Sequence, residues 1–363
     1  MLDRRLLQNI NWWLILLAVS LSLIGIAVIY AATIAMDPPA QIHKSQLKWL
    51  LVGLAAMTMM MAIDYNRVIK TAYMIHFVAI GVLLLTLLIS EPIAGVRRWL
   101  DLGLFRLQPS EIAKIASILA LVRLFSSEQL RRRPWLQIAG GLVIIGIPIL
   151  LILKQPDLGT AVMLFIPFVV LAFLAQERPW PLLVTALVGG LSAIPGWFML
   201  KDYQRMRIIA FIDPSYDELG SGYQAIQSKI AVGSGGVFGK GFCKSTQVRL
   251  QFLPAQHTDF IFSVHAEESG FVGSLLVIGL FTLLVIAAIS IATRAKDRTG
   301  LLLVMGCISL IASQFLINVA MVVGFLPITG LPLPFMSYGG SSLVGIFIML
   351  GLMQSVQMRR FAF

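Results

Sequence analysis

Apolar residues occur in long runs that short polar segments separate. A membrane-spanning helix needs roughly 20 mostly apolar residues, and ten runs approach or exceed that length. They lie near residues 12–33, 46–63, 70–90, 110–126, 134–153, 158–176, 180–199, 269–293, 300–323 and 338–357. This pattern predicts an all-α polytopic membrane protein of about ten transmembrane helices. Because the runs cover most of residues 1–363, we expect a single transmembrane domain.

The composition supports the same class of protein. Hydrophobic residues make up 58% of the chain and charged residues 12%, whereas charged residues make up roughly a quarter of a soluble domain. No small-residue cleavage site follows the first apolar run, so we expect a retained span and not a signal peptide. Cys243 lies in a loop and Cys307 in a span, and we predict neither a disulfide nor a cysteine metal site.

The net charge of +11 would indicate nucleic acid in a soluble protein, but here it has to be divided between two faces. Ten spans put both termini on one face, and a cytoplasmic N-terminus leaves fourteen basic residues on each side. The positive-inside rule applies to short loops. Without the seven basic residues of the long loop, and without the embedded Lys114 and Lys154, the count is fourteen inside and five outside. Both termini are therefore predicted to be cytoplasmic, the long loop at residues 200–262 extracytoplasmic, and nucleic acid is not expected as a partner.

The stretch Gln251–Gly270 contains two histidines and the carboxylates Asp259, Glu267 and Glu268, just before an apolar run that begins near Phe271. Charged groups beside a hydrocarbon layer are costly unless they face a cavity or a partner, so they are functional candidates. Asp259 is the first candidate. The alternative is a loop aspartate that caps the eighth span.

Further charged residues lie on the same predicted face. Arg97 and Arg98 suit bidentate phosphate recognition, although arginines in such a loop could also reach lipid headgroups. Glu111 and Lys114 are three residues apart, on one face of a predicted helix, as a structural or a substrate-contacting pair. Asp157 is expected either to cap the sixth span or to share a cavity with Asp259.

The loop between the seventh and eighth spans carries Arg205 and Arg207 near the membrane surface. Tyr223, Ile226 and Ile230 predict a helix on the outer face, followed by a glycine cluster that we expect to be flexible. The cluster matches neither nucleotide-binding glycine pattern. Residues 324–342 are rich in proline and glycine, and we expect a re-entrant segment that lines a cavity, with an ordinary tight loop as the alternative.

Six blocks, in order, resemble the SEDS family (shape, elongation, division and sporulation). They are RRW near residue 97, QPSEIAK, QPDLGT, GYQAIQSKIAVGSGGVFGKG, LPAQHTDFIF followed by AEE, and LPLPFMSYGGSS. The short tails are most similar to those of the elongation member. The chain departs from the family at Ala255, where relatives often carry Glu, and at Ser245, where Gly is common.

The resemblance implies a peptidoglycan glycosyltransferase that polymerises lipid II at the outer face of the bacterial cytoplasmic membrane, for cell elongation and rod shape. It implies a class B penicillin-binding protein as partner and a divalent cation, Mg²⁺ or Mn²⁺. The essential aspartate of the family falls on Asp259, as catalytic residue or metal ligand. The matched blocks place the substrate-binding candidates at Arg97, Arg98, Glu111, Lys114, Asp157, Arg205, Arg207, Gln256, His257 and Ser337.

Two mechanistic roles for Asp259 stay open: a base that takes the proton from the acceptor hydroxyl, or a ligand of a cation that bridges the pyrophosphate. Two rival functions also stay open. A lipid II flippase would need polar groups near the bilayer midplane on both sides of a cavity, and the isolated Gln314 and Asn318 are the visible candidates. A non-catalytic scaffold would tolerate the loss of Asp259.

Overall fold

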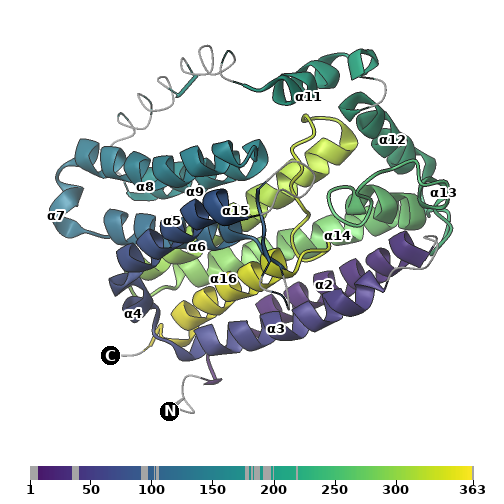
Figure 1. Cartoon of the computed structure of the whole chain (residues 1–363). Helices are drawn as coiled ribbons and strands as arrows, with labels where there is room; N and C mark the ends of the chain where they lie inside the picture. Colours follow the sequence, from purple (N-terminus) through teal and green to yellow (C-terminus); the bar gives the residue numbers. More distant parts are fainter. Residues whose placement is uncertain are drawn as a thin grey trace.

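A computed structural model of the chain describes residues 7–34, 41–90, 97–101, 103, 106–175, 180, 183, 189–190, 198, 200–217 and 220–361. The described chain is almost entirely helical (Figure 1). Its elements are α2 (Trp12–Ile34), α3 (Ile42–Ala62), α4 (Tyr65–Lys70), α5 (Ala72–Ile89), β1 (Leu100–Asp101), β2 (Arg106–Leu107), α6 (Pro109–Phe125), α7 (Glu128–Arg131), α8 (Pro134–Lys154), α9 (Leu158–Ala175), α11 (Asp202–Ile212), η1 (Pro214–Asp217), α12 (Ser221–Ser234), α13 (Thr246–Arg249), α14 (Ile261–Thr293), α15 (Arg298–Val323) and α16 (Gly340–Met358).

Eight of these helices are long and apolar enough to cross a membrane: α2, α3, α5, α8, α9, α14, α15 and α16. The predicted class, an all-α polytopic membrane protein, is therefore confirmed. A further predicted span, 110–126, corresponds to α6, which has 17 residues. The predicted span 180–199 lies outside the described residues except for a few isolated positions.

Helix α6 occupies the centre of the bundle. It packs against α5, α8, α9, α15 and α16, and nearly all of its side chains are buried, including Glu111 and Lys114. Pro109 in its first turn and Glu111 beside the helix N-terminus both favour the start of a helix at this point. A charged pair therefore lies inside the bundle and does not face lipid.

The beginning of α2 and the end of α16 meet at one end of the bundle. Gln354 accepts a hydrogen bond from the backbone N–H of Asn11 at 3.0 Å and donates one to its carbonyl at 2.7 Å. At the same end, Arg359 donates to the carbonyls of Met61 and Ala62, where α3 ends. Both ends of the described chain thus lie on one side, as an even number of crossings requires. Helices α11, α12 and α13 gather at the opposite end (Figure 1).

Helix α14 differs from the sequence expectation in where it begins and in being interrupted. We expected an apolar run from Phe271, but the helix begins ten residues earlier, at Ile261, and is interrupted at Gly270, whose φ of 66° and ψ of −160° are not helical. The residues from Ile261 to Glu268 are all buried. This segment is covered by protein and not by lipid, which is why it does not need an apolar sequence.

The glycine cluster after α12 is not a flexible connection, so that expectation was wrong. The N–H groups of Lys240 and Gly241 donate to the carbonyls of Glu267 and Glu268, both at 3.0 Å, and thereby pair with the broken turn of α14. A Cβ at Gly239 would lie 2.1 Å from the Glu268 carbonyl oxygen. Only glycine permits this approach, which satisfies backbone groups that the interruption at Gly270 frees from the helix.

Candidate functional site

A cavity of about 770 Å³ opens at the end of the bundle opposite the two termini. The beginnings of α3, α6, α9 and α16 contribute to its wall, together with the residues before α14 and the segment between α15 and α16. Five predicted site residues line it: Arg98, Glu111, Asp157, His257 and Asp259. We call it the Asp259 cavity. Residues from five separate parts of the sequence converge there, so the fold assembles a polar site at this end.

The backbone beside Asp259 is held by hydrogen bonds from both sides. Asn318 of α15 donates to the Asp259 carbonyl at 2.8 Å. The hydroxyl of Ser337 donates to the Thr258 carbonyl at 2.6 Å, and the Tyr338 N–H donates to the His257 carbonyl at 3.0 Å. These contacts fix the backbone of residues 257–259 and leave the Asp259 carboxylate facing the cavity. The first residue of α14 is preceded by Phe260 without a side-chain cap, so the alternative of Asp259 as the cap of this helix is wrong.

Burial determines the protonation of Asp259. The pKa of this carboxyl is raised from 3.8 to about 6: loss of hydration is the largest cause and Arg207 opposes it, while Asp157 also raises the pKa and Arg98 lowers it. A Cβ at Gly330 would lie 3.5 Å from Oδ2 of Asp259 and 3.8 Å from Nη1 of Arg207. The glycine, whose φ is +70°, thus leaves open the space beside the two charges.

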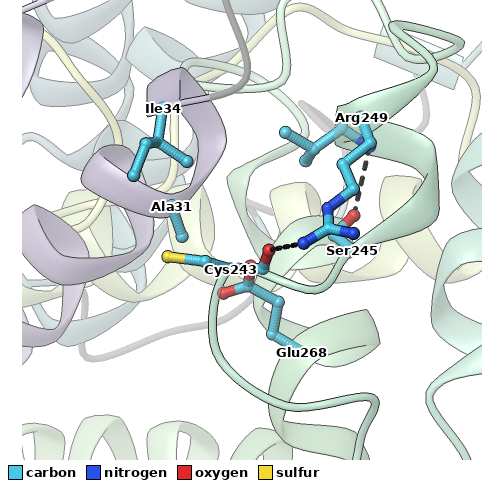
Figure 2. Close-up of a pocket in the computed structure, with 7 residues that line it drawn as sticks. Ala31, Ile34, Cys243, Ser245, Arg249 and Glu268 are labelled. Carbon is cyan, nitrogen blue, oxygen red and sulfur yellow. Dashed lines mark hydrogen bonds between the residues drawn. The ribbon is translucent and has the colours of Figure 1, made fainter. Parts of the chain in front are cut away.

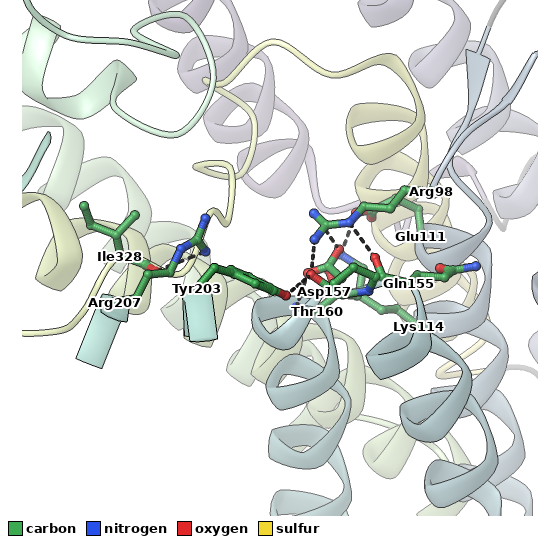
Figure 3. Close-up of polar contacts among 10 residues, drawn as sticks. Arg98, Glu111, Lys114, Gln155, Asp157, Thr160, Tyr203, Arg207 and Ile328 are labelled. Atoms are coloured by element: carbon green, nitrogen blue, oxygen red, sulfur yellow. Dashed lines mark hydrogen bonds and ion pairs between the residues drawn. The ribbon is translucent and has the colours of Figure 1, made fainter. Parts of the chain in front are cut away.

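Arg98 and Asp157 form one polar network on the other wall (Figure 3). Arg98 donates to the carbonyl of Gln155 at 2.9 Å and to that of Pro156, and its Nη1 lies 3.6 Å from Oδ2 of Asp157. The Oδ1 atom of Asp157 accepts the N–H of Thr160 at 3.1 Å in the first turn of α9. Asp157 therefore both caps α9 and lines the Asp259 cavity, so the two alternatives hold together.

Helix α11 brings Arg207 to the same site. The Tyr203 hydroxyl donates to the Pro156 carbonyl at 2.8 Å, which ties α11 to the turn between α8 and α9. Arg207, one turn further, lies over the Tyr203 ring at 5.9 Å and donates to the Ile328 carbonyl at 3.3 Å. Its guanidinium lies beside Gly330, as the Asp259 carboxylate does, and is within electrostatic reach of Asp259, although Arg207 does not itself line the cavity.

The charged pair of α6, Glu111 and Lys114, lies at the base of the Asp259 cavity. Nζ of Lys114 lies 2.8 Å from Oε1 of Glu111, and both side chains are buried. Glu111 lines the Asp259 cavity, whereas Lys114 lies behind it. Removal of either partner would leave a buried unpaired charge, which is expensive. The pair is structural in its contacts and can also present a carboxylate to a ligand.

The segment between α15 and α16 is non-helical, lines the cavity and is mostly buried, as expected of a re-entrant segment. Side chains of neighbouring helices satisfy its backbone. Gln314 donates to the Pro332 carbonyl and Asn318 to that of Leu331, at 2.8 and 2.7 Å. Gln46 of α3 bonds to the Ser337 carbonyl at 3.0 Å and to the Gly339 N–H at 3.2 Å. Irregular backbone is tolerated there because protein side chains replace water.

Six predicted residues do not line the cavity: Lys114 and Arg207, described above, and four more. Arg97 is exposed and donates to the Leu87 carbonyl. Arg205 donates to the Phe198 carbonyl and lies 3.9 Å from Asp202. Gln256 is buried and donates to the Ala32 carbonyl at 2.9 Å. Ser337 is also buried, behind the wall it supports.

The cavity also has a polar and aromatic lining that the sequence did not single out. Trp49, Trp99, Tyr338, Ser341 and Ser342 all face it. Aromatic and hydroxyl side chains are common at membrane interfaces, so nothing in their sequence context marks them. Their convergence gives the cavity flat surfaces and hydroxyl groups that suit a sugar.

The residues fit a divalent cation only as part of a shared site. No group of three or more His, Cys, Asp and Glu side chains that could hold a metal occurs among the described residues. Mg²⁺, however, is often bound by one or two carboxylates together with phosphate oxygens of a substrate. Asp259 and Asp157 line one cavity and supply such a pair.

Known proteins resemble the whole chain. A family model described as cell cycle protein, FtsW/RodA/SpoVE, matches residues 8–361. The peptidoglycan glycosyltransferase MrdB of Escherichia coli (strain K12) is 43% identical over 269 residues, covering 73% of this chain and 72% of MrdB. A solved chain from a peptidoglycan synthase complex is 31% identical with a TM-score of 0.82, covering 98% of this chain and 99% of that one. Rod shape determining protein RodA of Thermus thermophilus is 27% identical with a TM-score of 0.73, covering 98% of both chains.

Proposed function

The chain belongs to the FtsW/RodA/SpoVE family of cell cycle proteins, and from that premise we propose that it polymerises lipid II in the Asp259 cavity. It is a multi-pass protein of the inner membrane and a peptidoglycan glycosyltransferase. The lipid substrate, the outer face of the membrane as the place of reaction, and a role in cell elongation complete the proposal. The single observation that carries it is the Asp259 carboxylate, which lines a large cavity together with Arg98 and lies within electrostatic reach of Arg207.

Asp259 acts as the general base in this proposal. Glycosyl transfer requires removal of a proton from the acceptor hydroxyl, and the most effective base has a pKa near the working pH. Burial brings the pKa of Asp259 to about 6, so the carboxylate is ionised at pH 7 and still basic enough to take the proton. Its fixed backbone holds the carboxylate in one place, as a positioned base requires.

Arg98 and Arg207 stabilise the leaving group. The departing pyrophosphate gains negative charge, and preorganised cations at that position lower the barrier. Arg98 is fixed by two carbonyls and by Asp157, and Arg207 by the Ile328 carbonyl. Neither guanidinium has to reorganise during the reaction. Trp49 and Tyr338 provide flat apolar surfaces against which sugar rings of the donor or acceptor would pack.

A divalent cation is part of the proposal as a bound group. Asp157, with pyrophosphate oxygens, would hold it, so that Asp259 stays free as the base, and when bound the cation would supply further positive charge at the leaving group. A class B penicillin-binding protein is the proposed partner, which would crosslink the glycan product. The likeness to a chain of a peptidoglycan synthase complex supports such an assembly.

The test is polymerisation of lipid II by the purified protein with its partner in Mg²⁺ or Mn²⁺, with the product read on a gel. Asp259→Ala and Asp259→Asn are expected to reduce the rate by about 10²–10⁴-fold, the range of general-base catalysis. Asp202→Asn is the matched control, since Asp202 is a fully exposed acid of α11 and should leave the rate unchanged. Equal polymer yields from Asp259→Asn and the unaltered protein would refute the role of Asp259.

A further inference from the structure

Two consecutive glutamates precede the break in α14, and the first of them is fully satisfied. Glu267 has no exposed surface. Its carboxylate accepts Nζ of Lys240 at 2.6 Å, the Thr246 hydroxyl at 2.7 Å and the Thr246 N–H at 3.0 Å, and the Ser245 hydroxyl also donates to it. Glu267 therefore anchors the loop before α13 to the bundle, and both of its carboxylate oxygens already accept hydrogen bonds.

Glu268, the next residue, is only 5% exposed. The backbone N–H groups of Cys243 and Ser245 donate to its carboxylate, yet its Oε1 atom has no hydrogen-bond partner among the residues that the structure describes. A buried carboxylate oxygen without a donor is unfavourable. Glu268 lines a second cavity, of about 270 Å³, which we call the Glu268 pocket. None of its lining residues lines the Asp259 cavity. A residue with one unsatisfied acceptor oxygen thus lines a pocket outside the catalytic site.

A positive group borders the same pocket (Figure 2). Arg249, at the end of α13, donates one N–H to the Cys243 carbonyl at 3.2 Å, and a guanidinium carries five donors in all. Burial and the Glu268 carboxylate raise the pKa of the Cys243 thiol, while Arg249 lowers it. Both charges therefore act on one side chain in the pocket, and an acidic and a basic group line the same pocket.

The remaining wall is apolar and belongs to a membrane-spanning helix. Ala31 and Ile34 of the last turn of α2 face the pocket, with Val248 beside them. The nearby side chains of Phe242 and Leu250 are large, hydrophobic and exposed. The pocket is slightly smaller than the roughly 300–1,000 Å³ that encloses a drug-sized molecule, so it fits the head of a ligand whose apolar part remains in the membrane.

We propose that the Glu268 pocket binds the headgroup of a membrane phospholipid that carries a primary ammonium group, as phosphatidylethanolamine does. The ammonium donates to Glu268, the phosphate accepts from Arg249, and the chains extend along Ile34 at the edge of α2. A choline headgroup has no N–H to donate and a glycerol headgroup has no positive charge. The pocket therefore distinguishes phospholipids by their headgroup.

Native mass spectrometry of the purified full chain tests this. Phosphatidylethanolamine, phosphatidylcholine and phosphatidylglycerol with identical acyl chains are titrated separately into the same detergent. The unaltered protein is expected to bind the ethanolamine lipid about tenfold more tightly than the choline lipid. Glu268→Gln should remove this preference. Arg249→Gln should weaken both lipids by a similar factor, because they share the phosphate.

Matched controls separate the pocket from general charge effects. Lys244→Gln changes an exposed cation of the same loop, and Glu128→Gln an exposed acid of α7; both should bind as the unaltered protein does. Arg249 is exposed, so its variant tests the pocket even where Glu268→Gln fails to fold, which thermal unfolding reports. Equal binding of ethanolamine and choline lipids, or a preference that survives in a folded Glu268→Gln variant, would overturn the proposal. Displacement of the ethanolamine lipid by lipid II in equimolar amount would also overturn it, because the pocket would then serve the substrate.

Discussion

Replacement of Asp259 by Asn should stabilise the fold although it lowers the polymerisation rate. The folded protein binds a proton at Asp259 more tightly than the unfolded chain does, because burial raises the pKa from 3.8 to about 6. The free energy of unfolding therefore falls as the pH rises between these two values and stays constant above them. One pKa unit corresponds to 1.36 kcal/mol, so ionised Asp259 destabilises the fold by at most about 3 kcal/mol above pH 7. An amide cannot ionise, and the variant escapes this loss.

Thermal unfolding in detergent at pH 4 and pH 8 measures the effect. At pH 8 the variant should unfold at a higher temperature than the unaltered protein, by several degrees, and at pH 4 the two should nearly coincide. Asp202→Asn, with its fully exposed carboxyl, should show neither difference. Polymerisation by the unaltered protein should rise with pH through about 6, since the base has to be ionised. An Asp259→Asn variant of equal or lower stability at pH 8 would contradict the reasoning, because it would mean that the carboxylate stabilises the fold.

Other substitutions test the remaining walls of the site. Arg207→Gln should lower the polymerisation rate at least tenfold and Arg205→Gln less than about twofold, and equal losses would mean that both act through general charge. Lys114→Met should lower the free energy of unfolding by about 3–5 kcal/mol, because it leaves a buried unpaired carboxylate. The double variant with Glu111→Gln should lose less, because it leaves no unpaired charge. If thermal unfolding showed that the losses of the two single variants add up in the double variant, the pairing would be contradicted. Gly340→Ala would place a Cβ 2.3 Å from an indole ring, so it should lower stability by about 1–3 kcal/mol, and unchanged unfolding would show that the ring moves aside freely.

The apolar runs predicted the spans well because side chains that face lipid have to be apolar. The bounds of α2, α8, α9 and α15 lie within a few residues of the predicted runs. The same criterion missed residues 261–268, since they are covered by protein and tolerate histidine and glutamate. It also missed the function of the glycine cluster. Glycine is as typical of a flexible link as of a close backbone contact, and only the position of α14 decides between them.

Charged residues of the site were predictable because an ionised group near a membrane is costly unless it faces a cavity or a partner. Asp259 was predicted on this ground, Arg98 as a phosphate-binding arginine, and Glu111 and Asp157 as charged residues at predicted helix starts, and all four line one cavity. The direction of each side chain was not predictable. Arg97 and Arg98 are adjacent in sequence, but only Arg98 lines the cavity, whereas Arg97 is exposed and donates to the Leu87 carbonyl.

The positions of Gln314 and Asn318 bear on the choice between an enzyme and a transporter. Buried polar groups deep in α15 would be the expected mark of a path across the membrane. Both side chains are instead bonded to carbonyls of the segment before α16, and Asn318 also to that of Asp259. Their polarity serves the wall of the Asp259 cavity, since broken backbone inside a membrane protein needs such partners. Asn318→Leu should therefore lower the polymerisation rate, because it would displace Asp259. The rate at saturating lipid II should fall more than the lipid II concentration at half-maximal rate changes. A transporter would show the reverse, with labelled lipid translocation in liposomes abolished and polymerisation retained.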